Sequence, residues 1–231
     1  MHPAAAKLLI EVLCAAVIAT AAQAQDSGAS GQNNPSRERP VKILPDTPDN
    51  VSSGPSISAA DLASINLNMK TDNSAGLALD IIPGGQVIAG SKIGFRFTTK
   101  KPGYLILLNV DAEGKLSQIF PEAPTETGSV RDEPCLIKPG KPLIIPQLGS
   151  PYATFEFIAE PPVGVAMFVA LLSDKPVQLV DLPNAPPPTF APADTLKYVR
   201  DQTLTLVVPN RDNGQLERPK WSFDGKAYLV R

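Results

Sequence analysis

Apolar residues alternate with polar residues over two stretches that begin at residue 77. The alternating positions are Leu77, Leu79 and Ile81 in the first stretch and Ile93, Phe95 and Phe97 in the second. A period of two is typical of a strand with one buried and one exposed face. Pro83-Gly84-Gly85 interrupts the pattern between them. The chain therefore predicts two β-strands on either side of this break.

The following stretch, Tyr104 to Val110, is apolar except for Asn109. An unbroken apolar strand needs cover on both faces, which predicts a central position in a sheet. Just before it, residues 101–104 (KPGY) fit a type II turn. In such a turn Gly103 supplies the positive φ at the third position.

Residues 111–114 (DAEG) fit a hairpin loop, a type I turn closed by a left-handed glycine. The return strand is then marked by Leu116, Ile119 and Phe120. Asp111 and Glu113 are also candidate calcium ligands, an interpretation that competes with the hairpin. The hairpin already gives each special residue of this passage a role in the backbone.

A short helix is predicted ahead of these strands. Ser58 followed by Asp61 fits a capping box, in which each residue satisfies a free N–H group of the first turn. Leu62, Ile65 and Met69 fall on one helical face. We expect this helix to pack against the sheet that follows.

The second half of the chain continues the pattern of short strands. Residues 135–146 and 152–180 supply further strands, separated by Pro-Gly or Pro-Pro breaks. Residues 184–192 (NAPPPTFAP) predict an extended polyproline connector, and 195–202 one or two helical turns.

The last two apolar segments, 203–208 and 220–230, predict three closing strands, with Asp224-Gly225 as a hairpin turn. Many short strands with regularly spaced turns favour a mainly β fold, an antiparallel β-sandwich. An immunoglobulin-like arrangement is compatible with the pattern. We predict a single domain over residues 57–231.

The first 24 residues have the pattern of a secretory signal peptide. Lys7 precedes a largely apolar stretch, 8–22, and Ala22-Gln23-Ala24 fits a cleavage site that leaves Gln25 as the first mature residue. The protein is therefore expected in the periplasm or outside the cell. After cleavage it would have no membrane span.

Two alternatives to a cleaved signal are less favoured. A lipoprotein signal at Cys14 would need a small residue before it, whereas Leu13 stands there. An uncleaved span would need roughly 20 apolar residues, and the apolar stretch is shorter and contains Glu11. Residues 25–56 are polar and rich in Gly, Ser and Pro, which predicts a disordered tether.

Charge and composition exclude several functions. The formal net charge is −2 and no long basic run occurs, which argues against a nucleic-acid partner. His2 is the only histidine and leaves with the signal peptide. Hydrolases of the Ser-His-Asp or Cys-His type and zinc sites are therefore excluded in the mature chain. No glycine-rich phosphate loop occurs, and we expect no cofactor.

Cys135 is the one cysteine that remains after cleavage. A single cysteine forms no internal disulfide, so core packing must supply the stability. Cys135 stands at the start of a predicted strand, which favours a buried, inert thiol. A reactive or intermolecular thiol is the alternative.

Residues 77–177 resemble a bacterial family known as domain of unknown function 4384. The motif residues are Gly103, Tyr104, Asn109, Asp111, Gly114, Phe120, Pro121, Phe157, Ala159, Pro162, Gly164, Ala170, Leu171, Ser173 and Pro176. Glu122 departs from the family, which often has Asn after Phe-Pro. The resemblance implies a compact β-sandwich-like module, exported or appended to other domains, and it provides no established catalytic residues to carry over to this chain. Residues 178–231 would be a C-terminal strand extension.

Candidate interaction residues lie in two places. Arg131, Asp132 and Glu133 belong to a polar loop, 121–134, and suit acid–base chemistry or calcium binding, but they also fit a solvated loop. Trp221 and Tyr228 flank Asp224-Gly225 and suit a ligand platform on a sheet edge, or the core.

These observations favour an exported, non-catalytic binding or interaction module of the bacterial envelope. Its partner would be another envelope or secreted protein, and no feature of the sequence supports a small ligand. One alternative is an assembly accessory that works by strand-edge pairing. Another is a hydrolase that uses only carboxylates, which would require two carboxylates from different strands to converge in a pocket.

Overall fold

The computed structural model describes residues 57–69, 72–121, 135–177, 180–188, 191–210 and 213–231. These residues belong to one compact unit, Ser52–Arg231. The predicted signal peptide, its cleavage site at Ala22, Ala24 and Gln25, and the tether over 25–56 lie outside the described residues. So do Arg131, Asp132 and Glu133. Among the described residues, no helix has the length and apolar character needed to cross a membrane.

The larger sheet has the order β2-β12-β9-β4-β5, and β6 also pairs with β4. Its strands are β2 (Gln86–Val87), β4 (Gly103–Val110), β5 (Leu116–Phe120), β6 (Leu136–Ile137), β9 (Gly164–Ser173) and β12 (Trp221–Val230). Neighbouring strands are antiparallel except β12 and β2, which are parallel. β4 lies between β9 and β5, so its predicted central position is confirmed.

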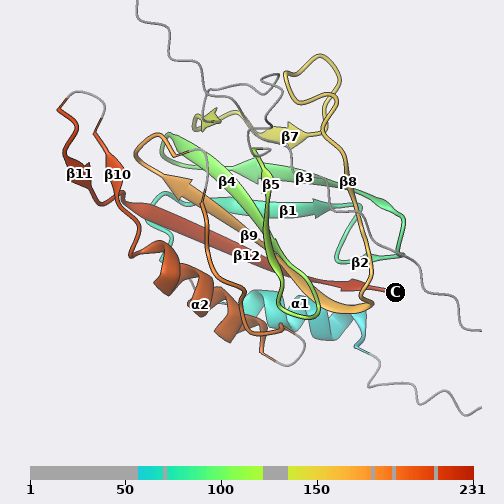
Figure 1. The fold of residues 1–231 in the computed structure, drawn as a ribbon. Helices are drawn as coiled ribbons and strands as arrows, with labels where there is room; N and C mark the ends of the chain where they lie inside the picture. Colours follow the sequence, from blue (N-terminus) through green and yellow to red (C-terminus); the bar gives the residue numbers. More distant parts are fainter. Residues whose placement is uncertain (1–56, 70–71, 122–134, 178–179, 189–190, 211–212) are drawn as a thin grey trace, which may run out of the picture. The chain divides into compact units, whose positions relative to one another are not determined.

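A smaller antiparallel sheet has the order β1-β3-β7, and β8 also pairs with β3. The remaining elements are β1 (Ala78–Ile82), β3 (Lys92–Thr98), β7 (Leu143–Ile145), β8 (Phe157–Ile158), a separate hairpin of β10 (Val208–Pro209) and β11 (Leu216–Glu217), and helices α1 (Ala59–Asn68) and α2 (Pro192–Thr203). Figure 1 shows the two sheets and both helices. The prediction of a mainly β, antiparallel fold is confirmed.

The main hydrophobic core lies between the two sheets. Alternating residues of β1 and β3, such as Leu79 and Phe95, meet Leu105 of β4 and Phe168 of β9 there. The rings of Phe95 and Phe168 pack edge to face with centroids 4.8 Å apart, a favoured geometry for aromatic pairs. The period-two pattern therefore predicted correctly which face of each of these strands is buried in the core.

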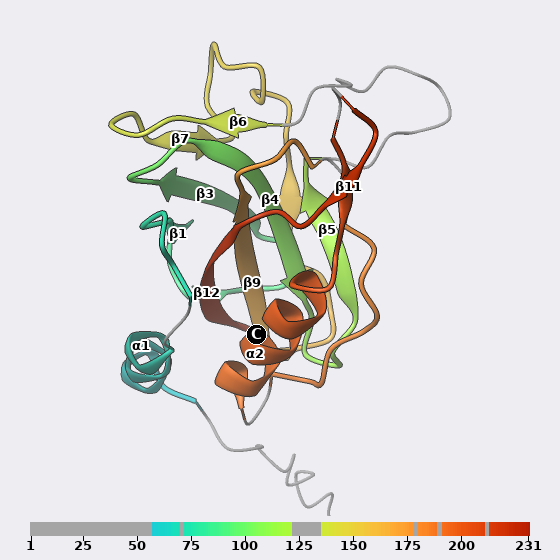
Figure 2. The ribbon, with the colours of Figure 1, turned by 90° about the vertical axis from the view of Figure 1, so that its left-hand side faces the viewer.

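The opposite face of the larger sheet is covered by α2 and the segment 180–185. Ile106 of β4 and Met167 of β9 pack there against Leu196 and Val199 of α2. Figures 1 and 2 both show α2 on the side of β9 and β12 away from β1 and β3. Cover on both faces accounts for the unbroken apolar sequence of β4.

The predicted hairpin turn at Asp224-Gly225 and the predicted three closing strands are wrong, because both residues lie within β12. It is one continuous strand whose ten residues all pair with β9, Gly225 lying opposite Val169. A Cβ atom on Gly225 would lie 2.5 Å from Met167 Cε and 3.0 Å from Leu196 Cδ2. The glycine therefore permits close packing of α2 on the sheet, and it makes no turn. Of residues 203–208, only Val208 enters a strand.

The type II turn predicted over residues 101–104 is also wrong, because Gly103 lies in a strand. It is the first residue of β4, it pairs with Ile137, and its φ lies outside the left-handed region. A Cβ atom there would lie 2.7 Å from Leu172 Cγ and 2.8 Å from the Ser173 carbonyl oxygen. Close approach of β9, and not a positive φ, explains this glycine.

Helix α1 begins as predicted, at the capping box of Ser58 and Asp61. Its buried Leu62 packs against Val165 and Ala227 of the larger sheet. The Asn66 side chain accepts from the Ala227 N–H (2.8 Å) and donates to its carbonyl oxygen (3.1 Å). The helix is thereby fixed to β12, which confirms that it packs on the sheet.

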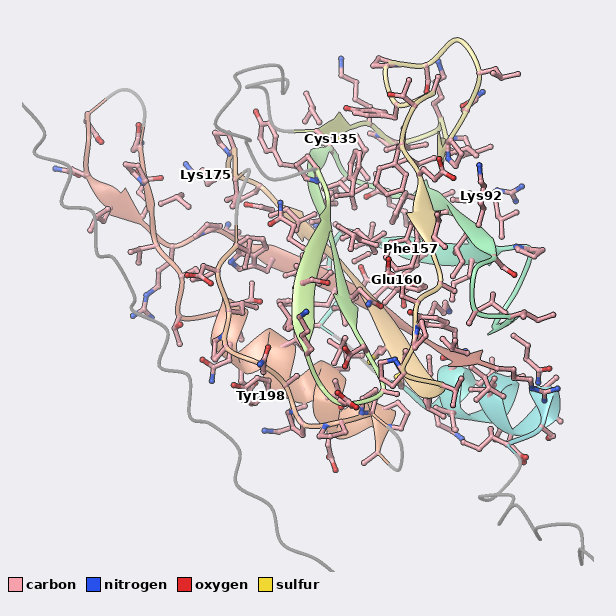
Figure 3. The ribbon with its side chains drawn as sticks, turned by 45° about the vertical axis from the view of Figure 1, so that its right-hand side comes forward. Lys92, Cys135, Phe157, Glu160, Lys175 and Tyr198 are labelled. Atoms are coloured by element: carbon pink, nitrogen blue, oxygen red, sulfur yellow. The ribbon has the colours of Figure 1, made fainter. Side chains whose placement is uncertain are left out.

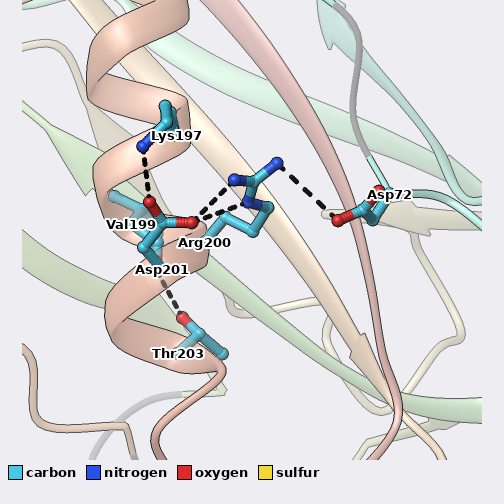
Figure 4. A network of polar contacts seen from close by, with 6 residues as sticks. All are labelled: Asp72, Lys197, Val199, Arg200, Asp201 and Thr203. Carbon is cyan, nitrogen blue, oxygen red and sulfur yellow. Dashed lines mark hydrogen bonds and ion pairs between the residues drawn. The ribbon is translucent and has the colours of Figure 1, made fainter.

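Helix α2 is longer than the one or two turns predicted, with twelve residues. Its exposed side carries the polar network of Figure 4. Asp201 accepts from Lys197 (2.8 Å) and from Arg200 (2.7 Å), which lowers the pKa of its carboxyl group. Arg200 also reaches Asp72, at 3.7 Å, ahead of β1. Ion pairs as exposed as these stabilise a fold only slightly.

Candidate functional site

A hollow of about 370 Å³ lies between the larger sheet and the segment 156–162 that contains β8. We call it the β8 pocket. Its lining residues are Asn109, Asp111, Lys115, Ser117, Glu156, Phe157, Ile158, Glu160, Pro161, Pro162, Ala166, Tyr228 and Val230. Volumes of this order are common for ligand sites.

The floor of the β8 pocket belongs to the sheet face that elsewhere forms the core. Asn109 of β4 stands directly opposite Ser117 of β5, so this face becomes polar at one end. Asn109 is the polar exception in the apolar run of β4, and the structure places it where the smaller sheet no longer covers it.

Tyr228 completes the floor from β12. Only 2% of Tyr228 is exposed, and its hydroxyl donates to Asn109 Oδ1 at 2.9 Å. The ring stacks on Phe168 with centroids 4.2 Å apart. Burial, with a smaller effect from Asp111, raises the pKa of the Tyr228 hydroxyl well above its ordinary value. The hydroxyl therefore remains a hydrogen-bond donor at neutral pH.

Asp111 forms one wall from the β4–β5 hairpin. Its Oδ1 atom accepts from the N–H groups of Glu113 and Lys115, each at 2.9 Å. Gly114 closes the loop with a φ of +88°. These contacts confirm the predicted hairpin, and they occupy one oxygen of Asp111 with the backbone of its own turn.

The segment 156–162 forms the facing wall, and Figure 3 labels Phe157 and Glu160 on it. The Phe157 ring is anchored on Phe168, with centroids 5.3 Å apart. Glu156 forms an ion pair with Lys92 at 2.6 Å. No described residue forms a hydrogen bond or an ion pair with the Glu160 side chain. Within the described part of the chain, no cluster of acidic, Cys or His residues could hold a metal ion.

The structure brings some of the family-motif residues together and leaves others in purely structural positions. Asn109, Asp111, Phe157 and Pro162 all line the β8 pocket. The remaining motif residues named above do not line it; they form turns, strands or core.

The two candidate aromatic residues, Tyr228 and Trp221, lie in different parts of the fold. Tyr228 lines the pocket, whereas Trp221 is 6% exposed and packs in the core beneath α2. Its indole Nε1 atom has no hydrogen-bond partner among the described residues. Trp221 therefore matches the core interpretation and offers no platform to a ligand.

Sequence reasoning missed Ser117, Lys115, Glu156 and Glu160. A signal for the two glutamates exists, because Glu156 and Glu160 are an even number of residues apart in the stretch EFIAE before a Pro-Pro break. In an extended segment this spacing places both carboxylates on the same face.

Cys135 lies in the main core with 4% of its surface exposed. Burial raises the pKa of its thiol, although a hydrogen bond with Tyr152 partly offsets this. Because the thiolate is the reactive species, we expect a thiol reagent to label the native protein far more slowly than the urea-unfolded protein. Rapid, stoichiometric labelling of the native protein would contradict this.

Comparison with known proteins agrees with this architecture. Residues 86–176 match the model of a family described as Domain of unknown function (DUF4384), which confirms the resemblance over less than half of the chain. No curated protein and no solved structure matches the chain. The matched region spans β2 to β9, so Tyr228 reaches the β8 pocket from outside it.

Proposed function

We propose that this protein is an exported, non-catalytic binding module of the bacterial envelope, and that the β8 pocket is its binding site. The observation that carries the proposal is the meeting of four family-motif residues from separate elements around one open hollow. Asp111 and Phe157 also serve the hairpin turn and the core, and Asn109 and Pro162 meet them at the pocket. The proposed partner is another envelope or secreted protein.

Export is proposed from the amino-terminal pattern. A positive start, an apolar stretch and Ala22-Gln23-Ala24 fit a secretory signal peptide. The proposed location is the periplasm or the extracellular space.

A binding role is favoured over hydrolysis by carboxylates alone. Glycosidases of that kind need two carboxyl groups with separate tasks. Asp111 already accepts hydrogen bonds from the backbone of its hairpin turn. Glu156 already forms an ion pair with Lys92. Of the carboxylates on the described residues that line the β8 pocket, Glu160 is then the one without such a task, which supports recognition.

Strand-edge pairing along the larger sheet is disfavoured because its long edges are occupied. On the outer edge of β12, the N–H groups of Phe223, Ala227 and Leu229 donate to Asp72 O, Asn66 Oδ1 and Gly85 O. Along β5, Leu116 N–H donates to Asn184 Oδ1 at 3.1 Å. Blocked edges of this kind protect a sheet from adding a foreign strand.

Site-specific photo-crosslinking in cells tests the proposal. A photoreactive phenylalanine analogue would replace Ile158, which is 41% exposed and lines the β8 pocket. The matched control places the same analogue at Ala193, an exposed position on α2. We expect one dominant crosslinked product from position 158 and not from position 193. The same products from both positions, or none from 158, would overturn the proposal.

A further inference from the structure

We infer that the β8 pocket takes an extended peptide with a lysine or arginine side chain, bound alongside the outer edge of β8. This inference rests on the proposed function and names the chemistry of the partner. It is carried by three features of the described residues: the free edge of β8, the charges around the pocket, and a second hollow that adjoins it.

The inner edge of β8 is used by β3 and the residues before it. The N–H of Ala159 donates to Ser91 O (2.9 Å), and its carbonyl oxygen accepts from Gly90 N–H (2.7 Å). Backbone groups alternate in direction along a strand, so those of Ile158 and Glu160 face away from β3. Both residues line the β8 pocket. An extended chain in the pocket could therefore pair with this edge.

This edge differs from that of β12, where Phe223, Ala227 and Leu229 N–H have partners, and from that of β5, where Leu116 N–H has one. The edge of β1 is also engaged, because Leu79 N–H donates to the Asp224 side chain. At β8, the groups that face outward border a hollow. Among the described residues, the β8 edge therefore combines outward backbone groups with an adjoining pocket.

The charges around the pocket favour a cation. Asp111 stands on the hairpin side and Glu160 on the β8 side, and no described residue forms an ion pair with either. Glu156 is neutralised by Lys92. Among the described lining residues, Lys115 is the one cation. The excess of carboxylates is complementary to a lysine or arginine side chain.

A second hollow, of about 560 Å³, shares Glu156 and Phe157 with the β8 pocket. Its other walls include Ile144, Pro146 and Phe155. The two hollows adjoin at the start of β8, where an extended peptide that leaves the acidic hollow can reach the apolar one. Since alternate side chains of an extended peptide share a face, the ligand should combine a cationic residue with an apolar residue on the same face.

Binding of four defined peptides to the full mature protein tests the inference. The parent probe is fluorescein-labelled Thr-Lys-Thr-Leu-Thr, and the second probe has Glu in place of Lys. The third and fourth are the parent N-methylated at alternate residues in each of the two registers, because N-methylation removes the amide N–H needed for edge pairing. Fluorescence anisotropy gives the affinity, and amide chemical shifts give the location.

We expect the lysine peptide to bind about tenfold more tightly than the glutamate peptide and to shift the amides of 156–160. One N-methylated register should lose binding and the other keep it. Glu160→Lys should reverse the charge preference, whereas Asp194→Lys on exposed α2 should not. Thermal unfolding of both variants checks that they remain folded.

Three results would overturn the inference: equal binding of the two charge forms, full binding of both N-methylated registers, or shifts confined to another surface. If no peptide binds at saturating concentration while Ile158 still captures a partner, the peptide inference falls and the proposed function stands. If position 158 captures nothing, both fall.

Discussion

Replacing Gly114 with alanine is expected to lower the free energy of unfolding by about 3 kcal/mol. Gly114 has a φ of +88°, and a Cβ atom there would lie 2.1 Å from the Ala185 carbonyl oxygen. The backbone of Ala185 is fixed in place there, because its N–H donates to the Gly114 carbonyl oxygen at 2.9 Å. Relief of the clash would displace the segment that covers β5.

Gly140→Ala is the matched control. Gly140 has a similar φ of +82°, but no atom lies within 4 Å of the position its Cβ would take. It should cost about 1 kcal/mol, the backbone strain alone. Urea unfolding can be followed by the fluorescence of Trp221, the single tryptophan. Equal losses in the two variants would contradict close packing of the 185 segment on Gly114.

The strands that the sequence predicted correctly are those whose burial is visible within a single run. In β3 the alternation of Ile93, Phe95 and Phe97 indicates a strand with one buried face. In β4 the unbroken run of apolar residues indicates a strand with two buried faces. The β4–β5 hairpin was predictable because Asp111 and Gly114 act within their own loop. In each case the interactions that decide the structure are local.

Gly225 and Gly103 show why other elements were not predictable. A glycine permits either a positive φ or a close approach, and neighbouring residues do not distinguish the two. Here the decisive contacts come from Leu196 on α2 and Leu172 on β9. The ten-residue pairing of β12 with β9 then overrides the local turn preference of Asp-Gly.

The β8 pocket was predictable only in part. Asn109 is conspicuous as the polar residue of an apolar strand, and Tyr228 could be named as a candidate aromatic. Their hydrogen bond joins positions 119 residues apart, so it depends on the pairing of β12, β9 and β4. Glu160 joins them because 156–162 runs beside the hairpin, which no local pattern indicates.

Replacing Asp224 with alanine is expected to lower the free energy of unfolding by about 1–3 kcal/mol. Asp224 Oδ2 accepts from Leu79 N–H at 2.7 Å and so joins β12 to β1 across the two sheets. Leu79 is fully buried, and its N–H would lose this partner. Asp224→Asn should cost less, because the amide oxygen can still accept the bond.

The pH dependence separates the charge of Asp224 from its hydrogen bond. Burial raises the pKa of the Asp224 carboxyl group, Asp80 adds to this slightly, and bonds from Leu79 and Gly225 and the charge of Lys226 oppose it. The fold therefore favours the protonated form. That contribution is complete below the unfolded-state pKa and is lost as pH rises through the higher folded-state pKa. Asp224→Asn has no such loss, so its stability relative to the native protein should increase between about pH 3 and about pH 7. A stability difference that stays constant across this range would show that burial does not disfavour the charged carboxylate.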